Sequence, residues 1–362
     1  MITFPCAKIN LGLNVINKRP DGYHNIETIF YPIPLNDALE IKLMDDRFPS
    51  KQNCDLKVTG KGVDCNEEDN IVVKAYNLLS KDFVLPRIHA HLYKNIPSQA
   101  GLGGGSSDAA FMIRLLDERF RLNIGNAEME RYAAMLGADC AFFITAEPSF
   151  ATGIGEVLSP ADSPHGNLNG YHLVVVKDDV AVSTKEAYAQ ITPAKPQVCC
   201  KDIVKMPIDK WKDLLTNDFE KPAFKAHPVL AEIKQKLYAL GAAYAQMSGS
   251  GSAMFGIFKN KPVIPEGTFG KADVYVMQLK KQKKQWTTKT NCFLSSMKTD
   301  RFLEASQEAK PTTAASCCTP LCICISSTLM ASFTCKSVPN GRTFSQANGI
   351  LPVADTSTMA RP

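Results

Sequence analysis

Long apolar runs are missing from this sequence. No stretch reaches about 18 consecutive apolar residues, the length that marks a membrane-spanning helix. The segment LCICISSTLMASF near the C-terminus is apolar but short and rich in hydroxyl groups. After Met1 there is also no basic segment leading into an apolar one, so we expect no secretion signal. These two absences predict a soluble, cytoplasmic protein with no membrane partner.

Cysteine pairs at zinc-finger or redox-motif spacing are absent from the first 278 residues. Without such spacing, we interpret the cysteines of this region as reduced thiols of a cytosolic protein and not as a disulfide framework. We therefore expect no metal-ligating residues from the cysteine pattern. Of the 12 cysteines, six fall in this region: Cys6, Cys54, Cys65, Cys140, Cys199 and Cys200.

A basic surface is lacking over most of the chain, although the formal net charge is +5. Residues 279–362 carry 11 Lys and Arg against 4 Asp and Glu, whereas residues 1–278 carry 30 against 32. Nucleic-acid binding requires clustered positive charge on the folded part of a protein. The charge distribution therefore predicts no nucleic-acid partner.

The final segment, residues 280–362, lacks sustained periodicity and is rich in Ser and Thr. We interpret it as a low-complexity, disordered tail or an appended extension. The alternative is a basic interaction tail, because it begins with KKQKKQW and holds the other six cysteines.

The remaining 279 residues alternate between strand-like and helix-like patterns, which predicts an α+β protein. The pattern restarts near residue 150, so we expect two domains, over 1–150 and 151–279. The expected elements are strands within 1–45, a helix over 70–83, a strand over 87–96, helices over 107–121 and 127–139, a strand over 171–177, a helix over 229–242, and strands over 252–258 and 273–279.

The glycine-rich stretch NIPSQAGLGGGSSDAAF follows a predicted strand and opens a predicted helix. Glycines let main-chain amides approach phosphate oxygens, and a helix start adds partial positive charge. Ser106, Ser107 and Asp108 suit the N-cap of that helix. The stretch lacks the lysine of a Walker A loop, and the G-x-G-x-x-G fingerprint fails from both Gly101 and Gly103. The order of elements predicts a phosphate-binding loop of another kind.

Three ordered motifs resemble those of the GHMP kinases, a family named for galacto-, homoserine, mevalonate and phosphomevalonate kinases. They are PCAKINLGLNV (5–15), the glycine stretch with its P-x-x-x-G-L-G-G-G-S-S-D-A-A pattern, and MSGSGSAMFGIF (247–258). The resemblance covers about residues 1–278. It implies an N-terminal ribosomal-protein-like domain that binds ATP and a C-terminal ferredoxin-like domain.

Within this family, AKINLGLNVINKRPDGYHNIETIF, GADCAFF and ATGIGEVL resemble the branch that phosphorylates a cytidine-diphosphate-linked methylerythritol. The resemblance implies transfer of the ATP γ-phosphoryl group to the 2-hydroxyl of that alcohol, in the non-mevalonate route to isoprenoid precursors. It also implies Mg²⁺ held largely by ATP, and a monomer or weak homodimer.

Phosphoryl transfer asks mainly for positioning and charge neutralisation, and an alcohol acceptor gains from a nearby carboxylate. Asp139 is the candidate base. It follows a predicted helix and precedes CAFFI, which we expect to form an apolar strand. Lys8 is its candidate partner, and Asn10 faces the same side of the strand and is expected to bind the acceptor. The alternatives are that Asp139 caps the next element, that Lys8 is a solvated residue at a strand edge, and that Asn10 is a turn or edge residue.

The acceptor site is predicted to include Tyr23 and His24, after an Asp-Gly turn. An aromatic ring can stack on cytosine, and a neighbouring histidine can read the base edge. A Tyr-His pair alone would more often serve packing, and the family resemblance is what assigns this pair to cytidine. Thr184 matches an acceptor segment by position only.

The nucleotide site is predicted to combine the loop with the segment that begins at Asn70. Ser98 and Gln99 stand where the family often has small residues, so we expect altered packing there without loss of phosphate binding. The residues that the resemblance assigns to ATP are Asn70, Ile71, Lys94, Pro97, Gly101, Leu102, Gly103, Gly104, Gly105, Ser106 and Ser107.

Two other functions stay open at this point. One is another kinase of the family, of the mevalonate or homoserine type. The other is a non-catalytic nucleotide or sugar sensor on the same fold, which the presence of both Lys8 and Asp139 disfavours.

Overall fold

The structure is a computed structural model, and it describes residues 1–62, 65–161 and 168–280. All of these residues belong to one compact unit. The predicted tail over 280–362 lies, apart from Lys280, outside the described residues. None of the described helices is both long and apolar enough to cross a membrane.

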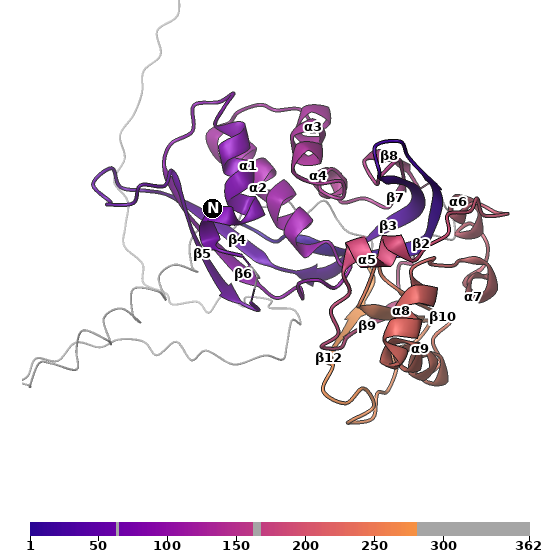
Figure 1. Cartoon of the computed structure of the whole chain (residues 1–362). Helices are drawn as coiled ribbons and strands as arrows, with labels where there is room; N and C mark the ends of the chain where they lie inside the picture. Colours follow the sequence, from indigo (N-terminus) through magenta and orange to yellow (C-terminus); the bar gives the residue numbers. More distant parts are fainter. Residues whose placement is uncertain (63–64, 162–167, 281–362) are drawn as a thin grey trace, which may run out of the picture. The chain divides into compact units, whose positions relative to one another are not determined.

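The first sheet carries the helices that precede and follow the glycine loop. Its strand order is β1-β4-β6-β5, and β5 and β6 run parallel because helix α1 lies in the crossover between them. Figure 1 shows α1 and α2 on one face of this sheet. The elements are β1 (Ile2–Thr3), β4 (Ala38–Leu43), β5 (Cys54–Gly60), the 3-10 turn η1 (Glu67–Asp69), α1 (Ile71–Leu79), β6 (Ile88–Lys94), α2 (Gly104–Phe120), α3 (Asn126–Leu136) and α4 (Phe142–Thr145).

Helix α1 shows why the local sequence folds as it does. The Asn70 side chain accepts a hydrogen bond from the Val72 amide, which caps the helix. Val72, Tyr76 and Leu79 then recur at helical spacing and pack into the core beneath the sheet. The predicted helix over 70–83 therefore exists but ends at Leu79.

The second sheet is built on a long hairpin, with strand order β2-β3-β7-β8. Its register shifts between Leu11 and Leu13, so Gly12 is a bulge residue at a φ of +71°, a conformation that glycine adopts without strain. The predicted domain boundary near residue 150 stays a prediction, and β7 lies across it. The strands are β2 (Cys6–Lys18), β3 (His24–Asn36), β7 (Ser149–Thr152) and β8 (Val157–Pro160).

The third sheet is antiparallel, with order β10-β11-β9-β12, and α9 packs on β10 and β11. Figure 1 shows α8 and α9 beside these strands. The C-terminal elements are β9 (His172–Lys177), α5 (Thr184–Ala189), α6 (Cys200–Ile203), η2 (Ile208–Lys210), α7 (Trp211–Leu214), α8 (Glu220–Ala226), α9 (Pro228–Ala239), β10 (Tyr244–Met247), β11 (Met254–Phe258) and β12 (Asp273–Gln278).

Candidate active site

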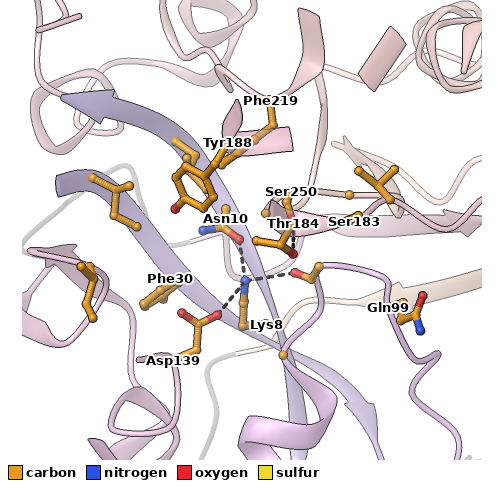
Figure 2. Close-up of a pocket in the computed structure, with 18 residues that line it drawn as sticks. Lys8, Asn10, Phe30, Gln99, Asp139, Ser183, Thr184, Tyr188, Phe219 and Ser250 are labelled. Atoms are coloured by element: carbon orange, nitrogen blue, oxygen red, sulfur yellow. Dashed lines mark hydrogen bonds and ion pairs between the residues drawn. The ribbon is translucent and has the colours of Figure 1, made fainter. Parts of the chain in front are cut away.

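A cleft of about 530 Å³ lies where both halves of the described chain meet. This volume is in the range of small-molecule sites. Figure 2 shows residues from β2, the glycine loop, α5 and the loop before β11 arranged around it. The lining residues are Lys8, Asn10, Leu13, Ile26, Phe30, Gln99, Gly101, Gly103, Asp139, Ile154, Val182, Ser183, Thr184, Tyr188, Phe219, Gly249, Ser250 and Gly251.

Lys8 and Asp139 meet in this cleft. The Lys8 Nζ lies 3.5 Å from Asp139 Oδ2, and it donates to Asn10 Oδ1 at 2.6 Å and to the Gly101 carbonyl oxygen at 3.0 Å (Figure 2). Its side chain is only 3% exposed, whereas that of Asp139 is 34% exposed. The ammonium is therefore held from several sides, and the carboxylate keeps access to the cleft.

Burial lowers the pKa of Lys8 below its ordinary value, because an ammonium loses hydration when it is enclosed. The charge of Asp139 and its hydrogen bond act in the opposite direction. The net result is a cation that is costly to bury and that depends on the carboxylate beside it.

Asn10 is held by a residue that the sequence analysis missed. The Asn10 amide nitrogen donates to Thr28 Oγ1 at 2.9 Å, and Thr28 in turn donates to the Gly12 carbonyl oxygen at the bulge. Since the amide nitrogen is thus occupied, the amide oxygen faces Lys8. Thr28 is completely buried in β3 and lies within a stretch quoted for the family resemblance, but its contact with Asn10 emerges only from the pairing of β2 with β3.

Asp139 lies in the turn between α3 and α4. The segment after it was predicted to be a strand, and that prediction is wrong: Phe142–Thr145 form helix α4. Phe142, Phe143 and Ile144 are all buried, so the run has no polar face to show a helical period. Gly155 lies beside the carboxylate, and a side chain there would begin 3.3 Å from Asp139 Oδ1.

The glycine loop leads directly into α2. Gly101 and Gly103 both have a φ of +71°, and a Cβ at Gly101 would lie 2.0 Å from the Ser248 carbonyl oxygen. The predicted capping role of Ser106, Ser107 and Asp108 is wrong, since α2 begins at Gly104 with Gly103 as its N-cap. The two left-handed glycines turn the chain early, so the helix starts inside the glycine run.

The start of α2 suits an anion. The first amides of a helix lack partners within it and carry partial positive charge. Here these amides belong to Gly104, Gly105 and Ser106. Ser107 is buried, and its hydroxyl oxygen has no hydrogen-bond partner among the described residues. This chemistry fits phosphate oxygens, and a metal ion bound to them.

Lys94 is buried beneath the loop instead of lining the cleft. Its ammonium pairs with Asp108 Oδ2 at 2.7 Å and with Asp37. Burial alone would lower the pKa of Lys94, but the charges of Asp108 and Asp37 outweigh it, so the pKa lies above its ordinary value. Burial raises the pKa of Asp108 well above its usual range. The predicted contact of Lys94 with nucleotide stays a prediction.

The other residues assigned to ATP surround the same loop. Asn70 caps α1, and the Ile71 side chain lies next to Gly105. Pro97 is buried, the Leu102 side chain packs into a core cluster, and the Leu102 carbonyl oxygen accepts the Lys8 main-chain amide at 2.9 Å. Their roles toward ATP stay predictions.

The predicted acceptor residues are only partly brought together. Thr184 lines the cleft and shares a 2.9 Å hydrogen bond with Ser250 (Figure 2). His24 stacks on Tyr188, with ring centroids 4.9 Å apart and an angle of 16° between the planes. Tyr188 lines the cleft and was missed from sequence, whereas Tyr23 is 61% exposed on the hairpin turn and does not line it.

The loop before β11 closes the cleft from the C-terminal half. The Ser248 hydroxyl donates to the Gly101 carbonyl oxygen at 2.8 Å. The Asn217 amide holds the same loop through bonds to the Met247 and Gly249 carbonyl oxygens at 2.8 and 2.9 Å. The sequence analysis identified this motif but assigned it no site residue.

Comparisons with known proteins agree with this geometry. Residues 70–147 match the family model for the GHMP kinases N terminal domain, and residues 201–266 match that for GHMP kinases C terminal. The 4-diphosphocytidyl-2-C-methyl-D-erythritol kinase of Bacteroides fragilis is 54% identical over 280 residues, which is 77% of this chain and 100% of that one. The Bacteroides thetaiotaomicron kinase of the same name is 53% identical, over 75% of this chain and 96% of its own.

A solved structure is also similar. The crystal structure of a 4-(cytidine 5'-diphospho)-2C-methyl-D-erythritol kinase superposes with a TM-score of 0.59 at 31% identity, covering 71% of this chain and 90% of that one. Together these matches account for the mixed helices and sheets described above.

Proposed function

This chain belongs to the GHMP kinase family and, within it, to the 4-diphosphocytidyl-2-C-methyl-D-erythritol kinases, and on this premise we propose that it transfers the γ-phosphoryl group of ATP to the 2-hydroxyl of that compound. The reaction provides a phosphorylated intermediate for isoprenoid precursor synthesis by the non-mevalonate route. The protein acts in the cytoplasm on a small molecule, as a monomer or weak homodimer.

One observation carries the proposal: an ion pair between Lys8 and Asp139, 3.5 Å apart, at the edge of a glycine-rich loop. A carboxylate, a cation and a phosphate-binding backbone in one cleft are the parts that phosphoryl transfer to an alcohol requires.

Asp139 is the residue that receives the proton of the acceptor hydroxyl. As that oxygen bonds to the γ-phosphorus, the bond from the phosphorus to the bridging oxygen of ADP breaks. The Lys8 ammonium orients Asp139 and offsets negative charge on the transferring group, since it is fixed by Asn10 and the Gly101 carbonyl.

The phosphates of ATP are held by the main-chain amides at the start of α2, where Gly101 and Gly103 leave no side chain in the way. An Mg²⁺ ion bound together with ATP would supply charge neutralisation. The unpartnered Ser107 hydroxyl is the group of this chain that fits such an ion or a phosphate oxygen.

The cytidine end of the acceptor lies toward His24 and Tyr188. Their rings stack on each other, and Tyr188 lines the cleft, so an aromatic stack of the kind that a nucleobase joins lies at its edge. Tyr23, on the neighbouring exposed turn, is free to cover the base, and Thr184 and Ser250 offer hydroxyl groups to the acceptor.

The experiment is a phosphorylation assay of the purified full chain with three acceptors: the cytidine-linked methylerythritol, mevalonate and homoserine. We expect ATP-dependent turnover of the first alone, and inhibition by cytidine diphosphate. Turnover of mevalonate or homoserine without such inhibition would assign the chain to another branch of the family. ATP binding with no turnover of any acceptor would favour a sensor.

A further inference from the structure

Two adjacent cysteines and a glutamate form a cluster outside the cleft. Cys199 and Cys200 stand at the start of α6, and Glu27 lies in β3, on which α6 packs. One ligand-type atom of each residue, a sulfur or a carboxylate oxygen, lies within 4.8 Å of the other two. Three groups that bind cations are thus gathered from parts of the chain more than 170 positions apart.

The Glu27 carboxylate is incompletely satisfied. Its Oε2 accepts a hydrogen bond from the Cys199 thiol at 3.6 Å, but its Oε1 is buried and has no hydrogen-bond partner among the described residues. Nor does a lysine or arginine of the described chain form an ion pair with it. A buried carboxylate oxygen left without a partner is costly, and a cation would remove that cost.

The two sulfur atoms belong to neighbouring residues and lie in the same 4.8 Å cluster as the Glu27 carboxylate. A bound metal ion would displace the thiol protons, because a coordinated thiol is deprotonated by the metal itself.

We propose that Glu27, Cys199 and Cys200 form a binding site for a thiophilic divalent cation of the Zn²⁺ type. Tetrahedral Zn²⁺, with Zn–S of about 2.3 Å and Zn–O of about 2.0–2.2 Å, separates a sulfur and an oxygen ligand by roughly 3.6 Å. The Cys199 Sγ and Glu27 Oε2 already lie 3.6 Å apart. Two thiolates select Zn²⁺ over Mg²⁺ or Ca²⁺, and water completes the fourth position.

The location indicates a structural effect. Ile26 and Thr28, on either side of Glu27 in β3, face the cleft or its hydrogen-bond network. Glu27 points to the other face of the sheet, toward α6. A cation held there would tie α6 to the back of the strand that supports the acceptor site.

The test uses the full chain and Zn²⁺ alone as the probe. Alkylation of each cysteine is followed by peptide mass spectrometry with and without Zn²⁺, so the thiols beyond residue 280 are read separately. We expect Zn²⁺ to protect Cys199 while the exposed Cys65, which is the internal control, stays reactive. In Glu27→Gln, half-protection of Cys199 should need at least tenfold more Zn²⁺.

Two results would overturn the site: no protection of Cys199 by Zn²⁺, or equal protection in Glu27→Gln and the unchanged protein. Because Cys200 is buried, Cys200→Ser is informative only if its circular dichroism is native, and Glu27→Gln carries the test otherwise. Kinase activity measured without Zn²⁺ should be unchanged in Glu27→Gln, which distinguishes a failure of this site from a failure of the proposed function.

Discussion

At the scale of single residues, Lys8 is the side chain on which the cleft depends. It is buried, it contacts both the acceptor-side amide of Asn10 and the loop carbonyl of Gly101, and its charge is balanced by Asp139. Each neighbour fixes one direction of the ammonium. A change at Asn10 or Asp139 should therefore affect turnover more than folding.

Asp139→Asn keeps the shape of the side chain but removes its ability to take a proton. We expect kcat to fall by about 10²-fold or more, the usual contribution of a general base, while ATP affinity stays nearly constant. Steady-state kinetics and nucleotide titration measure the two quantities. Asp45→Asn, at an exposed carboxylate, is the control, and a near-normal kcat in Asp139→Asn would remove Asp139 from the base role.

Thr28→Val replaces the hydroxyl that holds the Asn10 amide with a methyl group of similar volume. Loss of one partner in a buried hydrogen-bond network costs about 1–3 kcal/mol, so we expect kcat to fall by roughly tenfold with little change in the KM for ATP. Thr28→Ser retains the hydroxyl and should restore most of the rate. If both variants behave alike, Thr28 serves packing and does not position Asn10.

The lowered pKa of Lys8 makes a prediction about pH. Below its folded pKa, Lys8 is protonated in both states, and the cost of burying the charge is fully present. As pH rises from there toward the unfolded value of 10.5, the unfolded state binds more protons, so the unfolding free energy rises.

Urea titrations of the unchanged protein and Lys8→Met, from about pH 7 to pH 10, isolate this effect. The difference in unfolding free energy, unchanged protein minus variant, should increase with pH. A constant difference would show that Lys8 has an ordinary pKa in the folded protein.

At the scale of elements, the glycine loop and α2 act as one unit. The loop cannot accept side chains where its φ is positive, and the triad of Lys94, Asp37 and Asp108 fixes the helix start from below. Breaking a buried charge cluster by removing one member costs about 3–5 kcal/mol. We therefore expect the main role of Lys94 to be holding α2 in position.

Gly101→Ala tests the loop. A left-handed φ costs a non-glycine residue about 1–2 kcal/mol, and the new Cβ would also meet the Ser248 backbone, which cannot rotate away. We expect loss of ATP binding and a lowered melting temperature, by calorimetry and nucleotide titration. Gly125→Ala is the control, since Gly125 has a φ of −69° and open space around it. Equal melting temperatures in the two variants would contradict the strain argument.

The elements also show where sequence patterns succeed and fail. Helix α1 was predictable because its apolar residues recur on one face and Asn70 caps it. Helix α4 was not, because Phe142 and its neighbours are buried all round and aromatic residues favour strands. The start of α2 was placed too late, since glycine has low helix propensity and tertiary contacts overrode it.

At the scale of the whole molecule, motifs located the site but not its full composition. Lys8, Asn10 and Asp139 were predicted from motifs, and they do line one cleft. Tyr188 and Thr28 were not, because each matters only through a partner brought close by folding: His24 for one, Asn10 for the other. Contacts between distant segments leave no periodic signal in the sequence.

The predicted tail gives a test at this scale. A chain ending at Lys280 should keep its activity, and its unfolding free energy should change by less than about 1 kcal/mol, or roughly 2–4 °C in Tm. Loss of activity in this variant would show that the tail is an integral part of the folded, active protein.

Ending the chain two residues earlier, at Gln278, is the matched control. Leu279 is only 2% exposed, and its backbone bonds to Tyr171 and Gly170 at 2.8 and 2.7 Å. Its removal should destabilise the protein by about 2–5 kcal/mol, as for other buried leucines. Thermal unfolding of the two truncations separates them.

The Gly101 carbonyl oxygen accepts hydrogen bonds from both the Lys8 ammonium and the Ser248 hydroxyl. Segments near the two ends of the described chain thus share one acceptor atom, and neither can drift in evolution without the other. A hybrid enzyme that joins the front of one family member to the back of a distant one would bring mismatched backbones to this atom. Successful recombinants should inherit β2, the glycine loop and the loop before β11 from a single parent.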